Sequence, residues 1–217
     1  MYLRSQTIVI ATRNQGKISE FKVLFEPFQI KVRSLLDYQD LPVIEEDETT
    51  FADNSRKKAQ VISAHLHIPV LADDSGLCVD ALQGEPGVRS ARYAGEGASD
   101  EHNYQKVLQE LAIHHLASDS KRTIDIHSQS IQLLSSARFE CALTLVDDVS
   151  HIILSAQGSC EGFIIDTPIG THGFGYDPIF YIPHLGKTMA QLNIEEKNRF
   201  SHRAIALQKF MSQFTIA

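Results

Sequence analysis

The sequence is poor in cysteine and contains no tryptophan. The three cysteines, Cys78, Cys141 and Cys160, are far apart and none lies in a CxxC pair. This spacing argues against both a disulfide framework and a thiolate zinc site, so we expect buried, reduced thiols. The sequence also lacks an apolar run long enough to span a membrane, and its beginning lacks the apolar stretch of a signal peptide. These absences predict a cytoplasmic protein with no membrane partner.

Positive charge is also scarce. Twenty Lys and Arg residues face 27 Asp and Glu residues, which gives a net charge of −7. Nucleic-acid binding requires a clustered positive surface, so we expect no nucleic-acid partner. A small anionic ligand remains compatible, because a few basic side chains or a metal ion can reverse the local sign. The length of 217 residues and the 43% of hydrophobic residues are those of an ordinary globular domain.

The apolar spacing predicts alternating strands and helices, and no linker divides the chain, so we expect one α/β domain over residues 1–217. Strands are predicted at 7–11, 30–35, 68–72, 139–146 and 152–156. Helices are predicted at 17–25, 51–65, 100–116 and over the last thirty residues. Asn193 and Glu196 have the spacing of a capping box, and Ser201 would cap a new helix. The polar, Ser-rich segment 117–132 is interpreted as an exposed excursion.

The first chemical candidate is the loop Thr12–Lys17 between the first strand and helix. Backbone N–H groups and the positive end of the helix dipole suit a phosphate, as do the Asn, Gly and Lys side chains there. The loop matches neither a P-loop nor a GxGxxG site. Asn and Gly also occur in such turns for backbone geometry alone, so the loop by itself leaves both interpretations open.

A second candidate is Asp73-Asp74-Ser75-Gly76, which follows an apolar strand. Adjacent carboxylates are typical of Mg²⁺ sites, although solvated carboxylates in a turn are also common. The acidic run 45–48 could supply a further ligand, and Lys58 lies on the helix that follows it. The Gly173–Pro178 segment could present an aromatic ring to a nucleobase or form a hairpin with a buried ring. Lys197 and Ser201–Arg203 form either a binding turn or a solvated one.

Taken together and in order, these motifs are far more specific than any one of them. They read T-x-N-x-x-K, A-D-D-S-G-L, G-x-P-G-x-x-S-A-R-Y, G-F-G-Y-D-P and E-K-x-x-x-S-H-R, at Thr12–Lys17, Ala72–Leu77, Gly84–Tyr93, Gly173–Pro178 and Glu196–Arg203. This combination resembles the inosine triphosphate pyrophosphatase family over almost the whole chain. The resemblance implies Mg²⁺-dependent hydrolysis of ITP, dITP and XTP to the monophosphate and pyrophosphate. It also implies a homodimer and an elongated, mixed, twisted β-sheet flanked by helices, with two lobes and a central cleft.

The resemblance also implies a role for each matching residue. The triphosphate-binding loop would be Thr12, Arg13, Asn14, Gln15, Gly16 and Lys17. Asp74 would accept a proton and bind metal with Glu46, for which Glu45 is the alternative. Ser75 would lie beside the substrate, and Lys58 would neutralise phosphate charge. The base and sugar pocket would comprise Phe174, Gly175, Tyr176, Asp177, Lys197, His202 and Arg203.

These roles agree with the chemistry of pyrophosphate release. Lys17 and Lys58 would offset charge on the leaving group, and donors from the His202 backbone or Arg203 would favour a 6-oxo over a 6-amino purine. The segment 117–136 is longer than we expect for the family. Two alternatives remain: a related pyrophosphatase acting on pyrimidine or modified nucleotides, and a non-catalytic protein that senses a triphosphate.

Overall fold

The computed structural model describes residues 7–115, 122–126, 129–147, 149 and 152–213. These residues form two compact units: Met1–Ser75, Glu140–Ser159 and Asn198–Ala217 delimit the first, and Gly76–Phe139 and Cys160–Lys197 the second. Three strands, β3 (Val70–Val79), β5 (Gln129–Asp147) and β6 (Ile152–Ile165), pass from one unit into the other. The division agrees with the expected two-lobed fold, whereas the expected cleft between the lobes stays a prediction.

The first unit contains, besides its parts of these strands, β1 (Thr7–Ile10), α1 (Gln15–Phe25), β2 (Lys31–Ser34), α2 (Phe51–Leu66) and α5 (His202–Met211). The second unit adds α3 (Asp100–His115), β4 (Arg122–Ile126), β7 (Phe180–Ile182), β8 (Lys187–Thr188) and α4 (Ile194–Lys197). Single turns of 3-10 helix connect several of these elements.

The strands are hydrogen-bonded in the order β2-β1-β3-β5-β6-β7-β8, and β4 pairs with β5. Strand β1 is parallel to β2 and β3, whereas the pairs β4–β5, β6–β7 and β7–β8 are antiparallel. The sheet is therefore mixed and flanked by helices, which confirms the expected fold class.

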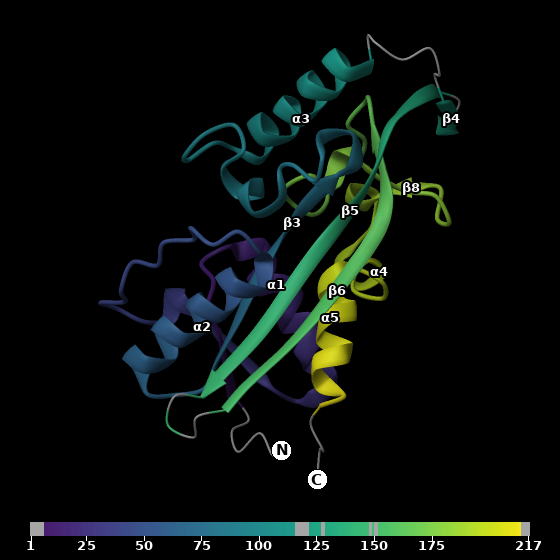
Figure 1. Cartoon of the computed structure of the whole chain (residues 1–217). Coiled ribbons are helices and arrows are strands. Elements are labelled where there is room, and N and C mark those ends of the chain that lie inside the picture. Colours follow the sequence, from purple (N-terminus) through teal and green to yellow (C-terminus); the bar gives the residue numbers. More distant parts are fainter. Residues whose placement is uncertain (1–6, 116–121, 127–128, 148, 150–151, 214–217) are drawn as a thin grey trace. The chain divides into compact units, whose positions relative to one another are not determined.

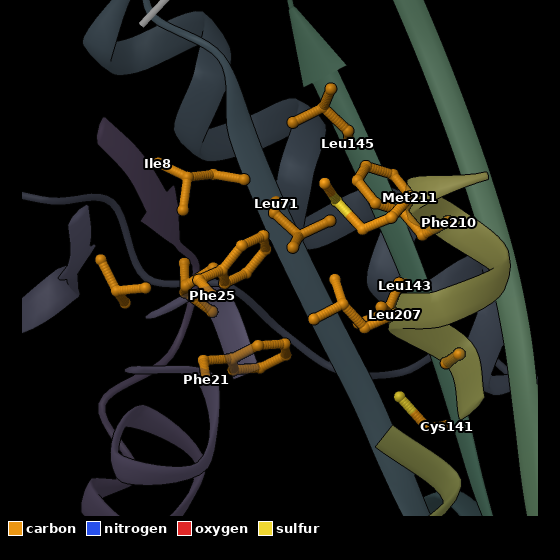
Figure 2. Packing of buried hydrophobic residues seen from close by; sticks show 13 residues of the cluster. Ile8, Phe21, Phe25, Leu71, Cys141, Leu143, Leu145, Leu207, Phe210 and Met211 are labelled. Atoms are coloured by element: carbon orange, nitrogen blue, oxygen red, sulfur yellow. The ribbon is translucent and has the colours of Figure 1, made fainter. Parts of the chain in front are cut away.

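The alternation of side chains along β1 and β3 divides the core of the first unit into two layers. Ile8 and Leu71 face one side of the sheet, where they join a cluster with residues of α1 and α5 (Figure 2). Val9 and Val70 face the other side and pack with residues of α2. Because successive residues of a strand point to opposite faces, helices must cover both sides of these strands.

Helix α5 runs along β6 in Figure 1, and Gly158 permits this close approach. A Cβ atom at Gly158 would lie 2.3 Å from the carbonyl oxygen of His202 and 2.4 Å from the backbone nitrogen of Ala206. The side chain of Ser201 caps α5 by accepting a hydrogen bond from the N–H of Ala204. The predicted cap at Ser201 is thus confirmed.

Two other predictions from the sequence, the capping box and the buried free cysteines, are confirmed. Asn193 and Glu196 exchange the two hydrogen bonds of a capping box. The three cysteines are free and buried. Among the described residues, no helix combines the length and the apolar character needed to cross a membrane.

The exposed excursion predicted at 117–132 is wrong for its described residues. Arg122–Ile126 forms β4, and β5 begins at Gln129 rather than at Phe139. Ile126 and Ile131 are buried in a small cluster with Ile165 and Tyr181. Apolar residues alternate with polar ones in both strands, so one face of the β4–β5 pair is buried although the segment as a whole is polar in composition. The remaining parts of the segment, 117–121 and 127–128, lie outside the described residues.

Candidate active site

The predicted triphosphate loop forms the N-terminus of α1. The side chain of Asn14 caps the helix, since its Oδ1 accepts a hydrogen bond from the N–H of Lys17 at 3.0 Å. Thr12 is buried, and its hydroxyl accepts a hydrogen bond from the N–H of Asn14. No acidic residue occupies the first turn of α1, so the positive end of the helix dipole is not neutralised there. Arg13 and Gln15 are exposed on this loop.

Helix α2 holds the acidic loop 45–48 in place. Asn54, which is buried in the first turns of α2, accepts a hydrogen bond from the N–H of Glu48 and donates one to its carbonyl oxygen. Asp47 pairs with Lys57 on the same helix. These contacts hold the Asp47–Glu48 end of the acidic loop against α2.

Lys58 connects the two carboxylates that were predicted to bind metal. Its Nζ lies 2.9 Å from Asp74 Oδ1 and 3.4 Å from Glu46 Oε1. Glu46 is therefore the residue of the acidic run that joins this group, whereas the neighbouring Glu45 is exposed. Burial alone would lower the pKa of Lys58, but the charges of Asp74 and Glu46 outweigh it and raise that pKa. Lys58 therefore carries a full positive charge between the two carboxylates.

Asp74 differs from an ordinary ion-paired aspartate. It is only 5% exposed, and its Oδ2 is buried with no hydrogen-bond partner among the described residues. Burial raises the pKa of Asp74 above its usual value, although the charges of Lys58 and Lys17 oppose the rise. A raised pKa makes a carboxylate a better proton acceptor at neutral pH, and an unpartnered buried oxygen calls for a ligand.

Asp73 has the opposite environment. Its Oδ1 accepts hydrogen bonds from Lys17 and from the hydroxyl of Ser75. Its Oδ2 accepts hydrogen bonds from Cys141 Sγ at 3.1 Å and from Arg203 Nε at 3.2 Å. Burial alone would raise the pKa of Asp73, but the charges of Arg203 and Lys17 hold it well below its usual value. Asp73 is therefore a permanently ionised anchor for the residues around it.

The two aspartates face opposite sides of β3. Asp73 shares the face of Leu71 with α1 and α5, whereas Asp74 shares the face of Val70 with α2. The prediction that β3 ends before Asp73 is wrong, because the strand continues to Val79. It can continue because each carboxylate is paired with basic side chains from a different helix.

Mg²⁺ is compatible with the oxygen atoms at Asp74. Within the part of the chain that the structure describes, no group of three or more His, Cys, Asp or Glu residues is assembled into a metal site. Asp74 and Glu46 nevertheless place two carboxylates around one lysine, and Asp74 Oδ2 lacks a partner. Mg²⁺ commonly binds one or two carboxylates and completes its shell with water and substrate phosphate oxygens. The residues present therefore fit this ion.

The predicted base and sugar residues are divided between the two units. In the second unit, Asp177 Oδ2 accepts hydrogen bonds from Lys197 Nζ at 2.5 Å and from the N–H of Phe174 at 3.0 Å. Lys197 also lies 4.7 Å from the centre of the Phe174 ring. A Cβ at Gly173 would overlap the Asp177 carboxylate, so only glycine fits there. Asp177 thus fixes both the lysine and the loop that presents the ring.

The rest of this loop is tied to the Gly84–Tyr93 motif and to α3. The N–H of Gly175 donates to Asp100 at 2.7 Å, and the hydroxyl of Tyr176 donates to the carbonyl oxygen of Ser90 at 2.7 Å. Ser90 in turn donates to the carbonyl oxygen of Gly87 and accepts from the N–H of Leu77. The motifs that seemed independent in the sequence form one hydrogen-bonded structure in the second unit.

His202 and Arg203 belong to the first unit, in the first turn of α5. Arg203 is 1% exposed, and its guanidinium donates to Glu20, Asp73 and Ser75. These contacts favour a role in holding Asp73, and the predicted contact of the Arg203 side chain with a base stays untested. The sequence predicted no role for Glu20 or Cys141, and it predicted Asp73 only as one of two adjacent carboxylates. Their apolar neighbours gave them the pattern of ordinary helix and strand positions, so only the adjacent aspartates offered a signal.

A two-unit α/β protein with a helix N-terminus and a lysine-bridged pair of carboxylates belongs to the class of proteins that bind polyanionic ligands. The sequence model of the Ham1 family matches residues 8–213, and the chain belongs to this family. It is 47% identical to the dITP/XTP pyrophosphatase of Geobacillus kaustophilus over 95% of this chain and 93% of that protein. It is also 47% identical to the dITP/XTP pyrophosphatase of Shouchella clausii, over 92% of each chain.

Solved structures of the family have the same fold. The Ham1 protein of Staphylococcus aureus aligns with a TM-score of 0.76 at 39% identity, over 95% of this chain and 97% of that one. The HAM1 protein of Coxiella burnetii aligns with a TM-score of 0.78 at 38% identity over the same shares. The fold predicted from the resemblance is therefore confirmed.

The buried pair of Glu20 and Arg203 makes a stability prediction. Both side chains are almost fully buried and join α1 to α5. Glu20→Gln leaves the guanidinium with a neutral partner, so we expect the free energy of unfolding to fall by about 3 kcal/mol. Urea denaturation measures this change, and Glu26→Gln, an exposed substitution just after α1, serves as the control. Equal stability of the two variants would contradict the prediction.

Proposed function

We propose that this protein hydrolyses dITP, ITP and XTP to the nucleoside monophosphate and pyrophosphate, and so removes non-standard purine nucleotides. The observation that carries the proposal is Asp74: a buried carboxylate with a raised pKa and an unpartnered oxygen, held by Lys58 beside Glu46. The names of the relatives from Geobacillus kaustophilus and Shouchella clausii support the substrate class. Binding alone would not require a proton acceptor in this position.

The first unit would supply the reaction chemistry. We assign to Asp74 the acceptance of a proton from the water that attacks the α-phosphorus, and to Lys58 the orientation of the Asp74 carboxylate. The N-terminus of α1, with Asn14, Gly16 and Lys17, would bind the triphosphate through backbone N–H groups and one positive charge. Charge that develops on the departing pyrophosphate is then offset by fixed dipoles and lysines.

Asp74 and Glu46 would hold Mg²⁺, with the remaining positions taken by water and phosphate oxygens. The bound ion would polarise the phosphoryl oxygens and lower the charge of the triphosphate. Lys58 keeps the two carboxylates close together, and Asn54 fixes the loop that carries Glu46.

In the second unit, we assign recognition of the base and sugar to Phe174 and Lys197. In the first unit, we assign it to the first turn of α5. The Phe174 ring has a face suited to stacking on a purine, and Asp177 holds Lys197 next to it. The N–H groups of His202 and Arg203 occupy the first turn of α5, where an α-helix provides no acceptor of its own. N–H donors of this kind would form hydrogen bonds to the 6-oxo group of a purine. A 6-amino group is itself a donor and would leave them without an acceptor.

Two further properties belong to the proposal. We infer a homodimer from the family resemblance. We place the protein in the cytoplasm on the grounds that its three cysteines are free thiols, which is typical of a reducing compartment.

A screen of nucleoside triphosphates tests the proposed function. With Mg²⁺ present, we expect pyrophosphate rather than orthophosphate from ITP, dITP and XTP, and a much lower rate with dATP, dTTP and UTP. The measurement is the rate of release of each phosphate product. Faster turnover of dTTP or UTP would identify a pyrimidine-directed pyrophosphatase, and tight ITP binding without product would identify a non-catalytic sensor.

Asp74→Asn tests the catalytic base. The substitution keeps the size of the side chain but removes its proton-accepting charge, so we expect turnover of ITP to fall about 10²–10⁴-fold. Steady-state kinetics measures the loss, and circular dichroism checks that the fold is kept. Asp40→Asn, which changes an exposed aspartate outside the acidic loop, is the control. Nearly full activity of the Asp74 variant would remove the proposed mechanism.

Glu46→Gln tests the metal assignment. Loss of one carboxylate weakens binding of a hard cation, so we expect the Mg²⁺ concentration for half-maximal pyrophosphate release to rise about tenfold. Chelation by EDTA should stop the reaction of the wild-type protein. Glu45→Gln removes an adjacent, exposed carboxylate and should leave the Mg²⁺ requirement unchanged. A raised Mg²⁺ requirement in Glu45→Gln, with none in Glu46→Gln, would assign metal binding to Glu45 instead.

A further inference from the structure

We propose that Cys141 is a positioning residue: its thiol orients the Asp73 carboxylate, and Asp73 in turn holds the Lys17 ammonium at the N-terminus of α1. The inference rests on the proposed function only in the assignment of the triphosphate to this helix end. The observations that carry it are the contacts of the Asp73 carboxylate inside the first unit.

The two oxygens of the Asp73 carboxylate have different partners. Cys141 Sγ and Arg203 Nε both donate to Oδ2, at 3.1 Å and 3.2 Å. Lys17 binds Oδ1, on the other side of the same carboxylate. The two donors on Oδ2 and the hydroxyl of Ser75 on Oδ1 together set the orientation of the carboxylate, and the position of Oδ1 decides where the lysine ammonium lies.

The thiol is well suited to this task. Cys141 lies on β5 at 1% exposure, with Leu143 and Leu207 in the same apolar cluster (Figure 2). Burial raises the pKa of Cys141 well above its usual value, and the charge of Asp73 raises it further. The sulfur therefore keeps its proton and acts only as a donor. In an apolar layer, a small donor satisfies the aspartate without adding another charge.

A cysteine that merely fills space would behave differently. Alanine and valine would then be tolerated according to volume alone, and serine, which is polar, would be the worst replacement. If Cys141 is a positioning donor, the serine variant should bind the ligand better than the alanine and valine variants. Serine keeps an O–H on the same Cβ, while alanine and valine have none. Binding of a phosphate chain and thermal stability therefore separate the two roles.

The test uses inorganic tripolyphosphate, which has no base or sugar and reports on the phosphate site alone. For Cys141→Ala and Cys141→Val, we expect calorimetric affinity for tripolyphosphate to fall about tenfold. For Cys141→Ser, we expect it to stay within about threefold of the wild type. Cys78→Ala is the matched control, since Cys78 is another buried cysteine on a strand but belongs to the second unit, whereas Cys141 and Asp73 belong to the first. The affinity of this variant for tripolyphosphate should not change.

Inosine binding and the KM for ITP complete the experiment. Inosine affinity should be equal in all variants that fold, while the KM for ITP should follow tripolyphosphate affinity. Wild-type affinity in both Cys141→Ala and Cys141→Val, or an equal loss in Cys141→Ser, would overturn the inference. If one variant fails to fold, the other two still decide. Absence of pyrophosphate release by the wild-type protein, with tripolyphosphate binding still dependent on the Cys141 donor, would refute the proposed function but leave the inference standing.

Discussion

The structure of the first unit depends on the compensation of two adjacent negative charges inside a sheet. Asp73 and Asp74 follow each other in β3, and both are buried. A buried carboxylate is costly unless basic or hydrogen-bonding partners surround it. Because the side chains of a strand alternate, one set of partners cannot serve both residues. Lys17 and Arg203 come from α1 and α5 on one side, and Lys58 comes from α2 on the other.

This division gives two identical side chains different chemistry. Asp73 has both oxygens occupied and a pKa held well below its usual value, so it serves as a fixed anchor. Asp74 has one occupied oxygen, one unpartnered oxygen and a raised pKa. Only the second environment suits a group that must exchange protons or bind an ion.

The sequence was informative where a local pattern carries the information. Apolar periodicity located α1, α2 and α3. The residue types at Ser201 and Asn193 predicted the N-terminal caps of two further helices near the end of the chain. It failed where long-range partners decide. The polar composition at 122–133 concealed a strand pair with one buried face. Strand β3 did not end at its aspartates, because Lys17 and the distant Arg203 neutralise Asp73. Glu20 and Cys141 gave no local signal at all.

The position of Arg203 changes the account of base selectivity. Its guanidinium donates to Glu20, Asp73 and Ser75, so its charge stabilises the anchor. A side chain buried in this way still fixes its own backbone, and the backbone of Arg203 forms the first turn of α5 with His202. Under the proposed function, selectivity for a 6-oxo purine would rest on backbone donors whose position the buried ion pairs determine. The same charges that hold Asp73 would thus align the groups that read the base.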